Sequence, residues 1–281
     1  MSQKHDPLGM KVLMWIHLAE RPLRIDEFRV ALAVEPGDTM LDDENLTPTT
    51  KILDCCLGLV VVDHETSSVR LVHYSLDEYF KSTRFREKYK EIFVEDGLSS
   101  IAQACLTYLN FAELSEHCST GEQVQQHISH FAFLHYAACH WGYHTRMYLS
   151  LEGPLHESAE QLTLKLLKRR KLPCAVQVLY MSRIAWRPWR YDSLEFDSSE
   201  YPYHFTGLHA AAFFGLGSIF GKLLPFFEKD IDTKDDDGRT PLYWACTRGH
   251  EDIASLLIAS KFGRVDINSR DVILQTSVEG S

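Results

Sequence analysis

The sequence predicts a mainly α-helical protein with three helices and a β-hairpin first, a helical connector next, and a short stack of repeated helix pairs last. Three observations lead to this prediction. Apolar residues recur at helical spacing through most of the chain, two short runs rich in valine and leucine flank a polar turn, and a C-terminal pattern recurs 34 residues further on, with Thr206 matching Thr240. The 281 residues suffice for about two domains.

Composition and charge exclude several classes of protein. The chain has 45% hydrophobic and 24% charged residues, which is typical of a globular protein, and its net charge of −10 disfavours binding to a nucleic-acid backbone. No apolar run reaches the roughly 18 residues that a membrane-spanning helix needs. The 7 cysteines are scattered without a C-x-x-C pair, so we expect reduced thiols. We therefore expect a cytoplasmic protein without nucleic-acid or membrane partners.

Residues 8–85 are predicted to form the first domain. The expected elements, in order, are helices over 8–18, over 25–32 and from Thr47-Pro48 onward, then strands over 59–62 and 69–72. The polar residues between the two runs predict the turn of a hairpin. Three helices followed by a β-hairpin is the order of a winged helix.

Residues 86–190 are predicted to be a helical connector. Its most regular apolar pattern, over 131–147, predicts an aromatic helix. The aromatic and acidic residues 191–204 follow it. We expect them to form an ordered linker that packs on its neighbours.

Residues 205–281 contain the internal repeat. The string Thr206-Gly207-Leu208-His209-Ala210-Ala211 aligns with Thr240-Pro241-Leu242-Tyr243-Trp244-Ala245. The ankyrin repeat has this signature and a period of about 33 residues. The sequence therefore predicts two complete ankyrin repeats and a truncated third.

Individual positions of the repeat have physical roles. The Thr240 hydroxyl can cap a helix that starts at Pro241, a position where no amide donor is needed. Gly215 and Gly249 permit the tight turn between the paired helices. The third copy has Leu274 where Thr240 caps the second, so we expect the second repeat to be uncapped on its outer side.

Five strings outside the repeat carry a family resemblance. They are Val12-Leu13-Met14-Trp15-Ile16, Arg21-Pro22-Leu23, Ala31-Leu32-Ala33-Val34-Glu35-Pro36-Gly37, Arg70-Leu71-Val72-His73-Tyr74-Ser75 and Phe133-Leu134-His135-Tyr136-Ala137-Ala138-Cys139-His140-Trp141-Gly142. The first four are similar to the winged-helix module named after GPI inositol-deacylase, and with the fifth and the repeat they resemble fungal proteins of the NACHT–ankyrin type. The resemblance implies a NOD-like protein in which an effector domain and a NACHT NTPase precede the winged helix, and the ankyrin array acts as sensor.

The chain departs from that family pattern in two respects, of which the first is the third repeat that fails after Val265-Asp266-Ile267-Asn268 and the second is a missing phosphate loop. It has no G-x-x-x-x-G-K-[ST] phosphate loop, and the nearest string, Gly217 to Lys222, has the wrong spacing. We therefore expect the NACHT domain to be absent and the chain to be a sensor-side fragment or a truncated gene model. Because a G-x-S-x-G elbow is missing too, we predict no enzymatic activity, no catalytic residues and no cofactor.

The predicted binding surface lies on the repeats. Ankyrin repeats bind partners with their hairpin tips and the concave face of their first helices. The partner-binding residues expected here are Asp235, Asp236, Asp237, Arg239, Tyr243, Trp244 and Arg248. Two questions stay open: whether Trp244 contacts a partner or packs on the adjacent repeat, and whether the three aspartates favour a basic partner or only form a solvated turn. Self-association through the uncapped end is also predicted.

A stretch rich in histidine and cysteine raises the alternative of a metal site. It contains His127, His130, His135, Cys139, His140 and His144. His135 with Cys139, and His140 with His144, share a helix face at i, i+4 spacing. Four converging ligands are not evident, so we expect packing and surface histidines and no metal.

The winged helix raises nucleic-acid binding as the alternative function. Its third helix would enter the major groove. That helix offers Lys51 against Asp54, and the wing carries Asp63 and Glu65 before Arg70. Such a face repels phosphate, so a contact with protein is the preferred interpretation.

Overall fold

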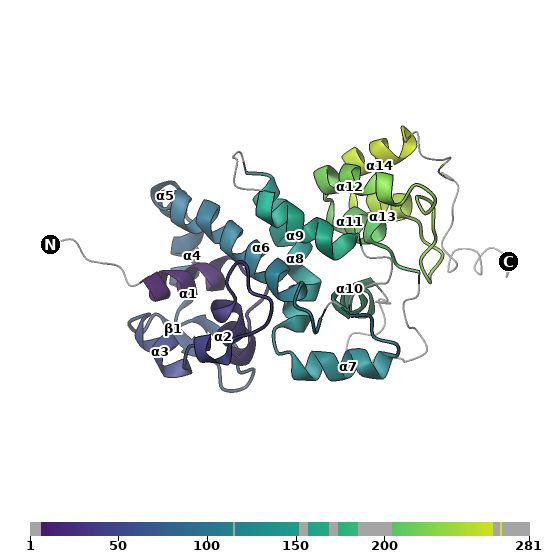
Figure 1. Ribbon diagram of the computed structural model, residues 1–281. Coiled ribbons are helices and arrows are strands. Elements are labelled where there is room, and N and C mark those ends of the chain that lie inside the picture. Colours follow the sequence, from purple (N-terminus) through teal and green to yellow (C-terminus); the bar gives the residue numbers. More distant parts are fainter. Residues whose placement is uncertain are drawn as a thin grey trace, which may run out of the picture. The chain divides into compact units, whose positions relative to one another are not determined.

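The computed structural model describes residues 7–114, 116–151, 157–168, 174–184, 204–260 and 265. The chain divides into two compact units (Figure 1). The first comprises Met1–Phe111 and Phe131–Gly153, and the second comprises Ala112–His130 and Pro154–Ser281. The chain therefore passes from one unit to the other three times. The prediction of a mainly helical protein is confirmed.

The N-terminal part of the first unit has the element order of a winged helix. Its elements are α1 (Pro7–Leu18), α2 (Ile25–Ala33), the 3-10 helix η1 (Asp43–Asn45), α3 (Thr49–Asp54), β1 (Val60–Val62) and β2 (Val69–Leu71). The two strands pair antiparallel, with Val60 opposite Leu71. The Val69 N–H also donates to the Leu23 carbonyl (2.8 Å), which attaches the hairpin to the segment before α2.

Helices α6 and α8 complete the core of the first unit. The chain continues through α4 (Tyr74–Lys81), α5 (Thr83–Lys88), the π-helix η2 (Lys90–Glu95), α6 (Asp96–Leu109) and, after an excursion into the second unit, α8 (Leu134–Leu149). The fully buried Trp15 of α1 lies edge-on to Phe133, with ring centroids 5.9 Å apart. Gly97 lets α6 approach α1, because an added Cβ would lie 2.6 Å from Leu18 Cδ1. The winged helix thus shares its hydrophobic core with α6 and α8.

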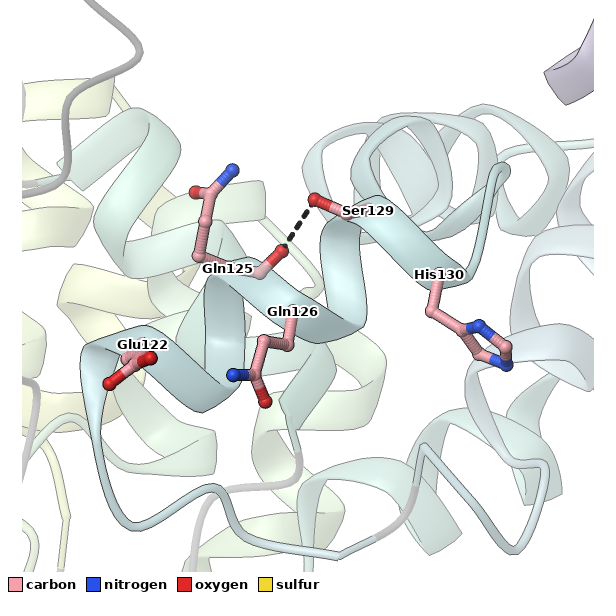
Figure 2. A pocket seen from close by; sticks show the side chains of 5 residues that line it. All are labelled: Glu122, Gln125, Gln126, Ser129 and His130. Atoms are coloured by element: carbon pink, nitrogen blue, oxygen red, sulfur yellow. Dashed lines mark hydrogen bonds between the residues drawn. The ribbon is translucent and has the colours of Figure 1, made fainter.

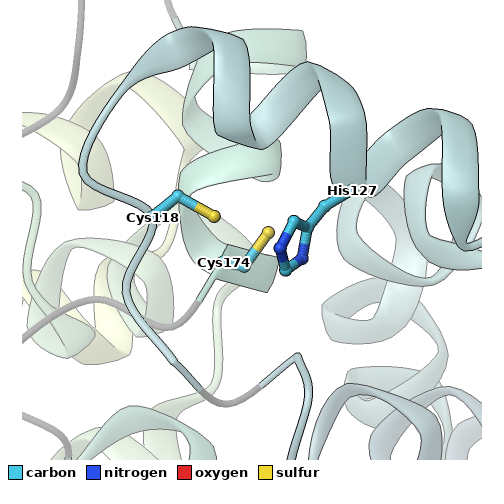
Figure 3. A group of neighbouring side chains, drawn as sticks. All are labelled: Cys118, His127 and Cys174. Atoms are coloured by element: carbon cyan, nitrogen blue, oxygen red, sulfur yellow. The ribbon is translucent and has the colours of Figure 1, made fainter.

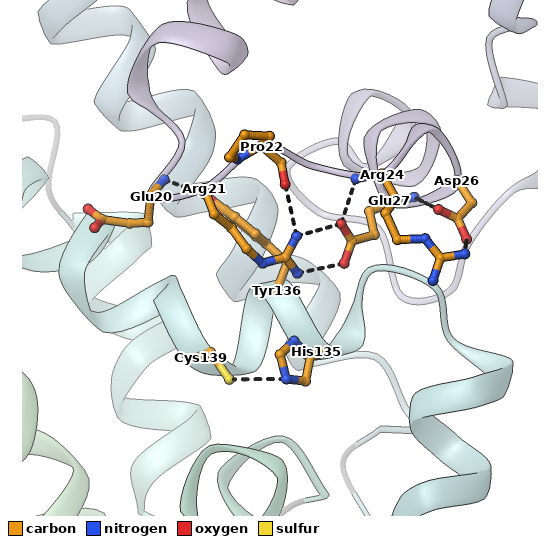
Figure 4. A network of polar contacts seen from close by, with 9 residues as sticks. All are labelled: Glu20, Arg21, Pro22, Arg24, Asp26, Glu27, His135, Tyr136 and Cys139. Atoms are coloured by element: carbon orange, nitrogen blue, oxygen red, sulfur yellow. Dashed lines mark hydrogen bonds and ion pairs between the residues drawn. The ribbon is translucent and has the colours of Figure 1, made fainter. Parts of the chain in front are cut away.

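An ion pair fastens the loop between α1 and α2. Arg21 donates two hydrogen bonds to the Glu27 carboxylate (2.8 and 2.7 Å), and the Arg24 N–H donates a third (2.8 Å; Figure 4). The Arg21 guanidinium also lies 5.1 Å from the centre of the Tyr136 ring. The Tyr136 hydroxyl in turn accepts a hydrogen bond from the Glu20 N–H (3.1 Å). Paired hydrogen bonds between ionised groups are strong and directional, so they hold this loop against α8.

The second unit contains both repeats and the helices packed on them. Its elements are α7 (Gly121–His130), α9 (Glu157–Leu167), α10 (Cys174–Leu179), the π-helix η4 (Tyr180–Ile184), α11 (Gly207–Phe214), α12 (Gly217–Leu223), the 3-10 helix η5 (Leu224–Phe226), α13 (Pro241–Arg248) and α14 (Glu251–Ile258). Helix α9 packs on α11 and α12, α11 packs on α13, and α10 packs on α7. The two predicted repeats are the pairs α11/α12 and α13/α14.

The predicted ends of the repeat helices are confirmed. The Thr240 hydroxyl accepts a hydrogen bond from the Tyr243 N–H (3.2 Å), and Pro241 is the first helical residue. Gly215 and Gly249 end the first helix of each pair in the left-handed region, at φ 75° and 72°. Glycine adopts this conformation without the steric penalty that a Cβ brings.

His209 connects the two repeats. It is fully buried, its Nδ1 accepts a hydrogen bond from the Thr206 N–H (3.0 Å), and its Nε2 donates to the Arg239 carbonyl (3.1 Å). Burial lowers the pKa of His209 to about 4. A neutral imidazole therefore bridges the start of α11 and the hairpin that leads into α13.

Helix α9 covers the outer side of the first repeat. Its buried residues are Ala159, Thr163, Leu166 and Leu167. Gly207, the first residue of α11, lies directly against the backbone of Leu167, and an added Cβ would overlap the Leu167 carbonyl oxygen. Lys222 of α12 forms an ion pair with Glu160 of α9. The surface that covers α11 within this unit is thus small and aliphatic.

Two predictions concern segments outside the described residues. The linker over 191–204 is described only at its last residue, and the third repeat only at Val265. Both stay predictions.

Candidate partner-binding surface

The tip of the hairpin before α13 is organised around Asp235. This residue is 4% exposed, and its carboxylate accepts hydrogen bonds from the N–H groups of Asp237 (3.0 Å) and Arg239 (2.8 Å) and from Trp244 Nε1 (2.9 Å). Burial raises the pKa of Asp235 to about 6, although the backbone hydrogen bond from Arg239 acts in the opposite direction. Asp235 therefore stabilises the conformation of the hairpin tip and offers little surface to a partner.

The other two aspartates of the tip have partners inside the chain. Asp236 accepts from the imidazole of His204 at 2.9 Å, and Asp237 pairs with Arg239 at 3.0 Å and accepts from the Tyr180 hydroxyl at 3.1 Å. All three carboxylates thus accept hydrogen bonds or form ion pairs within the turn or with residues that lie next to it. This favours the alternative in which they build the turn over the one in which they select a basic partner.

Trp244 packs on the preceding repeat. It is 6% exposed and lies edge-on to Phe213 of α11, with ring centroids 5.6 Å apart. The Arg239 guanidinium lies 5.1 Å from the centre of the Trp244 ring. The structure therefore supports the interpretation in which Trp244 packs on the adjacent repeat.

Cationic and aromatic groups lie at the start of α13 and along it. The Arg239 guanidinium lies 5.6 Å from the centre of the Tyr243 ring, and Arg248 lies 4.0 Å from the centre of the Phe213 ring. Arg248 is exposed and Tyr243 half-buried. We call Arg239, Tyr243 and Arg248 the α13 face. It can bind a protein by hydrogen bonding, ring stacking and charge, because its guanidinium groups are already oriented by rings and by Asp237.

Helix α14 exposes apolar side chains beside this face. Leu256 and Ile258 are 40% and 64% exposed, whereas Ile253 and Leu257 are fully buried. The helix is therefore apolar on two sides, one of which packs on α12. The other side bears the exposed Leu256 and Ile258, and the uncapped outer side expected from the sequence stays a prediction.

The winged helix has few basic side chains on the elements that would contact DNA. Helix α3 spans Thr49–Asp54, and Lys51 is exposed on it. In the hairpin, Arg70 forms an ion pair with Asp63 at 2.8 Å. The local charge of this arginine is therefore balanced, which weakens a contact with phosphate.

The histidine- and cysteine-rich stretch divides into packing pairs on α8. Cys139 Sγ lies 4.0 Å from His135 Nε2, and His144 Nε2 lies 2.9 Å from the Tyr136 hydroxyl (the first pair is drawn in Figure 4). His140 and His144 are buried, and burial lowers the pKa of His144 to about 4. Within the described ranges, the residues placed to share a metal ion are His127 of that stretch, Cys118 and Cys174. The sequence analysis named His127 but did not connect it with the two cysteines, because Cys174 lies far from it in the chain.

Helix α7 borders an open depression of about 410 Å³. Its lining residues are Glu122, Gln125, Gln126, Ser129 and His130. The Ser129 hydroxyl donates to the Gln125 carbonyl (3.0 Å), and Figure 2 shows the His130 imidazole directed away from it. The depression therefore does not assemble a serine–histidine pair.

The element order, the hairpin and the repeated helix pairs define the class of protein: a mostly helical chain with an N-terminal winged helix and C-terminal ankyrin repeats. Residues 2–92 match the family model described as the winged helix domain of GPI inositol-deacylase, and residues 198–278 match the model of ankyrin repeats in three copies. More particularly, then, the chain carries a winged helix domain of the GPI inositol-deacylase type followed by ankyrin repeats.

One curated protein shares a short similar segment. Over 29 residues the chain is 55% identical to acyl-CoA-binding domain-containing protein 6 of Danio rerio, which covers 10% of this chain and 10% of that protein. No solved structure matches the chain. In the part of the chain that the structure describes, no helix is both long and apolar enough to cross a membrane.

Proposed function

We propose that this chain is a non-enzymatic protein–protein interaction module that scaffolds a NOD-like signalling assembly in the cytoplasm, on its sensor side. The single observation that carries the proposal is the α13 face, where Arg239 and Tyr243 are held in contact and Arg248 is exposed. Arginine and tyrosine are enriched among the residues that dominate binding energy at protein interfaces. The ankyrin repeats support a protein partner, because such repeats offer extended binding surfaces.

The partner surface that fits the α13 face combines an apolar patch with carboxylates. Tyr243 contributes a ring that is already ordered by Arg239, so little conformational entropy is lost when it is covered. Arg248 is exposed where its guanidinium lies over the Phe213 ring, and it can pair with a carboxylate at the rim of the interface. Asp236 and Asp237 are less suited to select a basic partner because they already bind His204 and Arg239.

A second copy of the chain is proposed as a further partner, at the outer side of α14. Leu256 and Ile258 are exposed there, and an isolated repeat does not bury its apolar face without a neighbour. Association through this side would be detected as a concentration-dependent sedimentation coefficient. Ile258→Asp should abolish it, and Arg248→Glu should leave it unchanged.

The absence of nucleic-acid binding and of catalysis is part of the proposal. The pairing of Arg70 with Asp63 and the overall charge of −10 support the first. For the second, the buried His144 has a lowered pKa and bonds to Tyr136, which suits packing better than proton transfer.

The experiment uses the exposed Cys246, which lies on α13 three residues beyond Tyr243. An environment-sensitive fluorophore on Cys246 of the full chain reports binders selected from a displayed protein library. We expect Tyr243→Ala and Arg248→Glu to weaken a selected binder about 30-fold or more, which corresponds to about 2 kcal/mol. Lys51→Glu on α3 is the matched control and should change the affinity less than about twofold.

Two results would contradict the proposal. One is a set of binders that tolerate both α13 variants but lose affinity with Lys51→Glu. The other is salt-dependent binding of duplex DNA, measured by fluorescence anisotropy and lost on that same change. Circular dichroism of each variant separates a lost contact from a lost fold.

A further inference from the structure

Two thiols and an imidazole converge in the second unit, outside the α13 face. Cys118 precedes α7, His127 lies on α7, and Cys174 begins α10. One ligand atom of each lies within 4.8 Å of the others. Both cysteines are buried and neither is in a disulfide, whereas His127 is half-buried. Figure 3 shows the two sulfur atoms directed towards each other beside the His127 ring.

The backbone around the two cysteines is held by hydrogen bonds that do not involve the thiols. Gln177, which is fully buried on α10, accepts from the Cys118 N–H (2.9 Å) and donates to the Cys118 carbonyl (3.1 Å). The Cys174 N–H donates to the Glu116 carbonyl (2.9 Å). The segment before α7 and the start of α10 are therefore fixed side by side, as the supporting groups around a metal site usually fix its ligands.

We propose that Cys118, His127 and Cys174 bind one Zn²⁺ ion, with water in the fourth position. In a tetrahedral zinc site the sulfur atoms lie about 2.3 Å and the imidazole nitrogen about 2.0–2.1 Å from the metal, so its ligand atoms are roughly 3.5–3.8 Å apart. The observed cluster, with all three atoms within 4.8 Å, reaches this geometry through small side-chain rotations. This proposal revises the expectation from the sequence that the chain has no metal site.

The donor set selects the class of metal. Two thiolates and one imidazole suit zinc and other thiophilic ions, whereas Mg²⁺ and Ca²⁺ prefer oxygen ligands. On binding, each thiol loses its proton as the sulfur–zinc bond forms, so two protons leave for each ion bound. The two thiolate charges then balance the charge of Zn²⁺, and His127 binds as the neutral imidazole.

A zinc ion at this position would join α7 to α10. Helix α7 packs on α10, its Val124 is fully buried, and Gln177 of α10 bonds to Cys118 just before α7. The ion would add three bonds between the segment before α7, the helix itself and α10. Removal of the metal should therefore loosen 116–130 more than the repeats.

The test uses the full chain, purified under reducing conditions, stripped with a chelator and titrated with Co²⁺ as a spectroscopic probe. We expect one Co²⁺ per chain, with the intense visible bands of a tetrahedral site and thiolate-to-metal charge-transfer bands, all displaced by one equivalent of Zn²⁺. Cys118→Ala and Cys174→Ala should each lose a thiolate band and weaken zinc binding about 100-fold or more, because changes even in supporting groups cost up to that amount.

Matched controls separate the site from general surface binding. His130→Gln lies on α7 one turn beyond His127, and Cys246→Ala removes an exposed thiol; both should bind Co²⁺ as the unchanged chain does. If the cysteine variants fail to fold by circular dichroism, His127→Gln decides, because it should keep the charge-transfer bands but weaken binding about 100-fold. Weak octahedral bands in the unchanged chain, or equal affinity in His127→Gln, would overturn the proposal.

Discussion

The two repeats begin and end alike but bury different shares of their side chains. The first helix of the first repeat, α11, is buried at all 8 residues, whereas its counterpart α13 is buried at 4 of 8. Of the second helices, α12 buries three residues and α14 two, and Ile258 of α14 is 64% exposed. The first repeat lies between α9 and the second repeat, while the helices that pack extensively on α13 and α14 within the described ranges are α11 and α12. The repeat signature therefore determines the helix ends, and the neighbouring helices determine how much apolar surface is buried.

The largest expected effect comes from adding one methyl group to a glycine, at Gly207 where α11 begins against α9 and at Gly249 where α13 ends. Gly207→Ala should lower the free energy of unfolding by about 3 kcal/mol, since its Cβ would overlap the Leu167 backbone. Gly249→Ala should cost about 1–2 kcal/mol, because it has open space but a φ of 72°. Urea unfolding of the full chain measures both. A larger loss of stability for Gly249→Ala than for Gly207→Ala would contradict the comparison.

The next effect is acid sensitivity, which we expect from the first repeat alone. The folded state lowers the pKa of His209 to about 4, so the unfolded chain takes up the proton first and stability falls as the pH drops from about 6.5 to 4. At pH 5 the loss is about 2 kcal/mol. The second repeat has Tyr243 at the aligned position, which does not titrate in this range.

The measurement for His209 is a difference between two chains. His209→Gln and the unchanged chain are unfolded in urea at pH 7 and pH 5, and the stability advantage of the unchanged chain should shrink by about 2 kcal/mol at the lower pH. The difference between the two chains is needed because Asp235 also responds to pH. Its pKa is raised to about 6 in the folded state, so its contribution to stability falls as the pH rises through 4 to 6, which is opposite in direction to that of His209. An advantage that stays constant with pH would contradict the assignment of a neutral, buried His209.

A smaller effect is expected at the helix caps. Thr240→Ala removes the acceptor for the Tyr243 N–H and should cost about 1 kcal/mol, whereas Thr240→Ser should restore most of it. Thermal unfolding of the two variants measures these costs. If alanine and serine cost the same, the hydroxyl does not cap the helix.

The smallest effect is expected on the outer side of α14. Ile258→Ser should change the free energy of unfolding of a dilute, monomeric sample by less than about 0.5 kcal/mol, because the side chain is mostly exposed. Ile253→Ala, fully buried on the same helix, is the contrast and should cost about 2–5 kcal/mol. A cost above about 1 kcal/mol at Ile258 would mean that this side is covered.

Local patterns predicted most of the fold. The helix periodicity and the turn between Val62 and Val69 were sufficient for the winged helix, and the recurrence from Thr206 to Thr240 was sufficient for the repeats. These features are encoded within a few residues of one another, where propensity, capping and turn chemistry act. The outcome for Trp244 could not be decided in this way, since its burial depends on Phe213, which lies in the other repeat.

The candidate sites were less predictable than the fold. Asp235 belongs to an acidic run that looks like a solvated tip, yet three hydrogen bonds place it inside the turn. The set of Cys118, His127 and Cys174 has no spacing signature, because its members come from a loop and two helices. The packing of α7 on α10 and the hydrogen bonds of Gln177 and of the Cys174 N–H bring them together. No local sequence pattern predicts packing of this kind between residues that are far apart in the chain.

The interleaving of the two units has a consequence for the order in which the chain is synthesised. Residues 112–130 leave the ribosome before α8, which the first unit needs, and well before α10, on which α7 packs. Val124, fully buried in the finished protein, therefore has no cover from α10 until residues 174–179 have been translated. A nascent chain of this protein carries α7, a largely polar helix, without its partner α10 across the whole interval, and the apolar side chain of Val124 is what a chaperone would have to protect there.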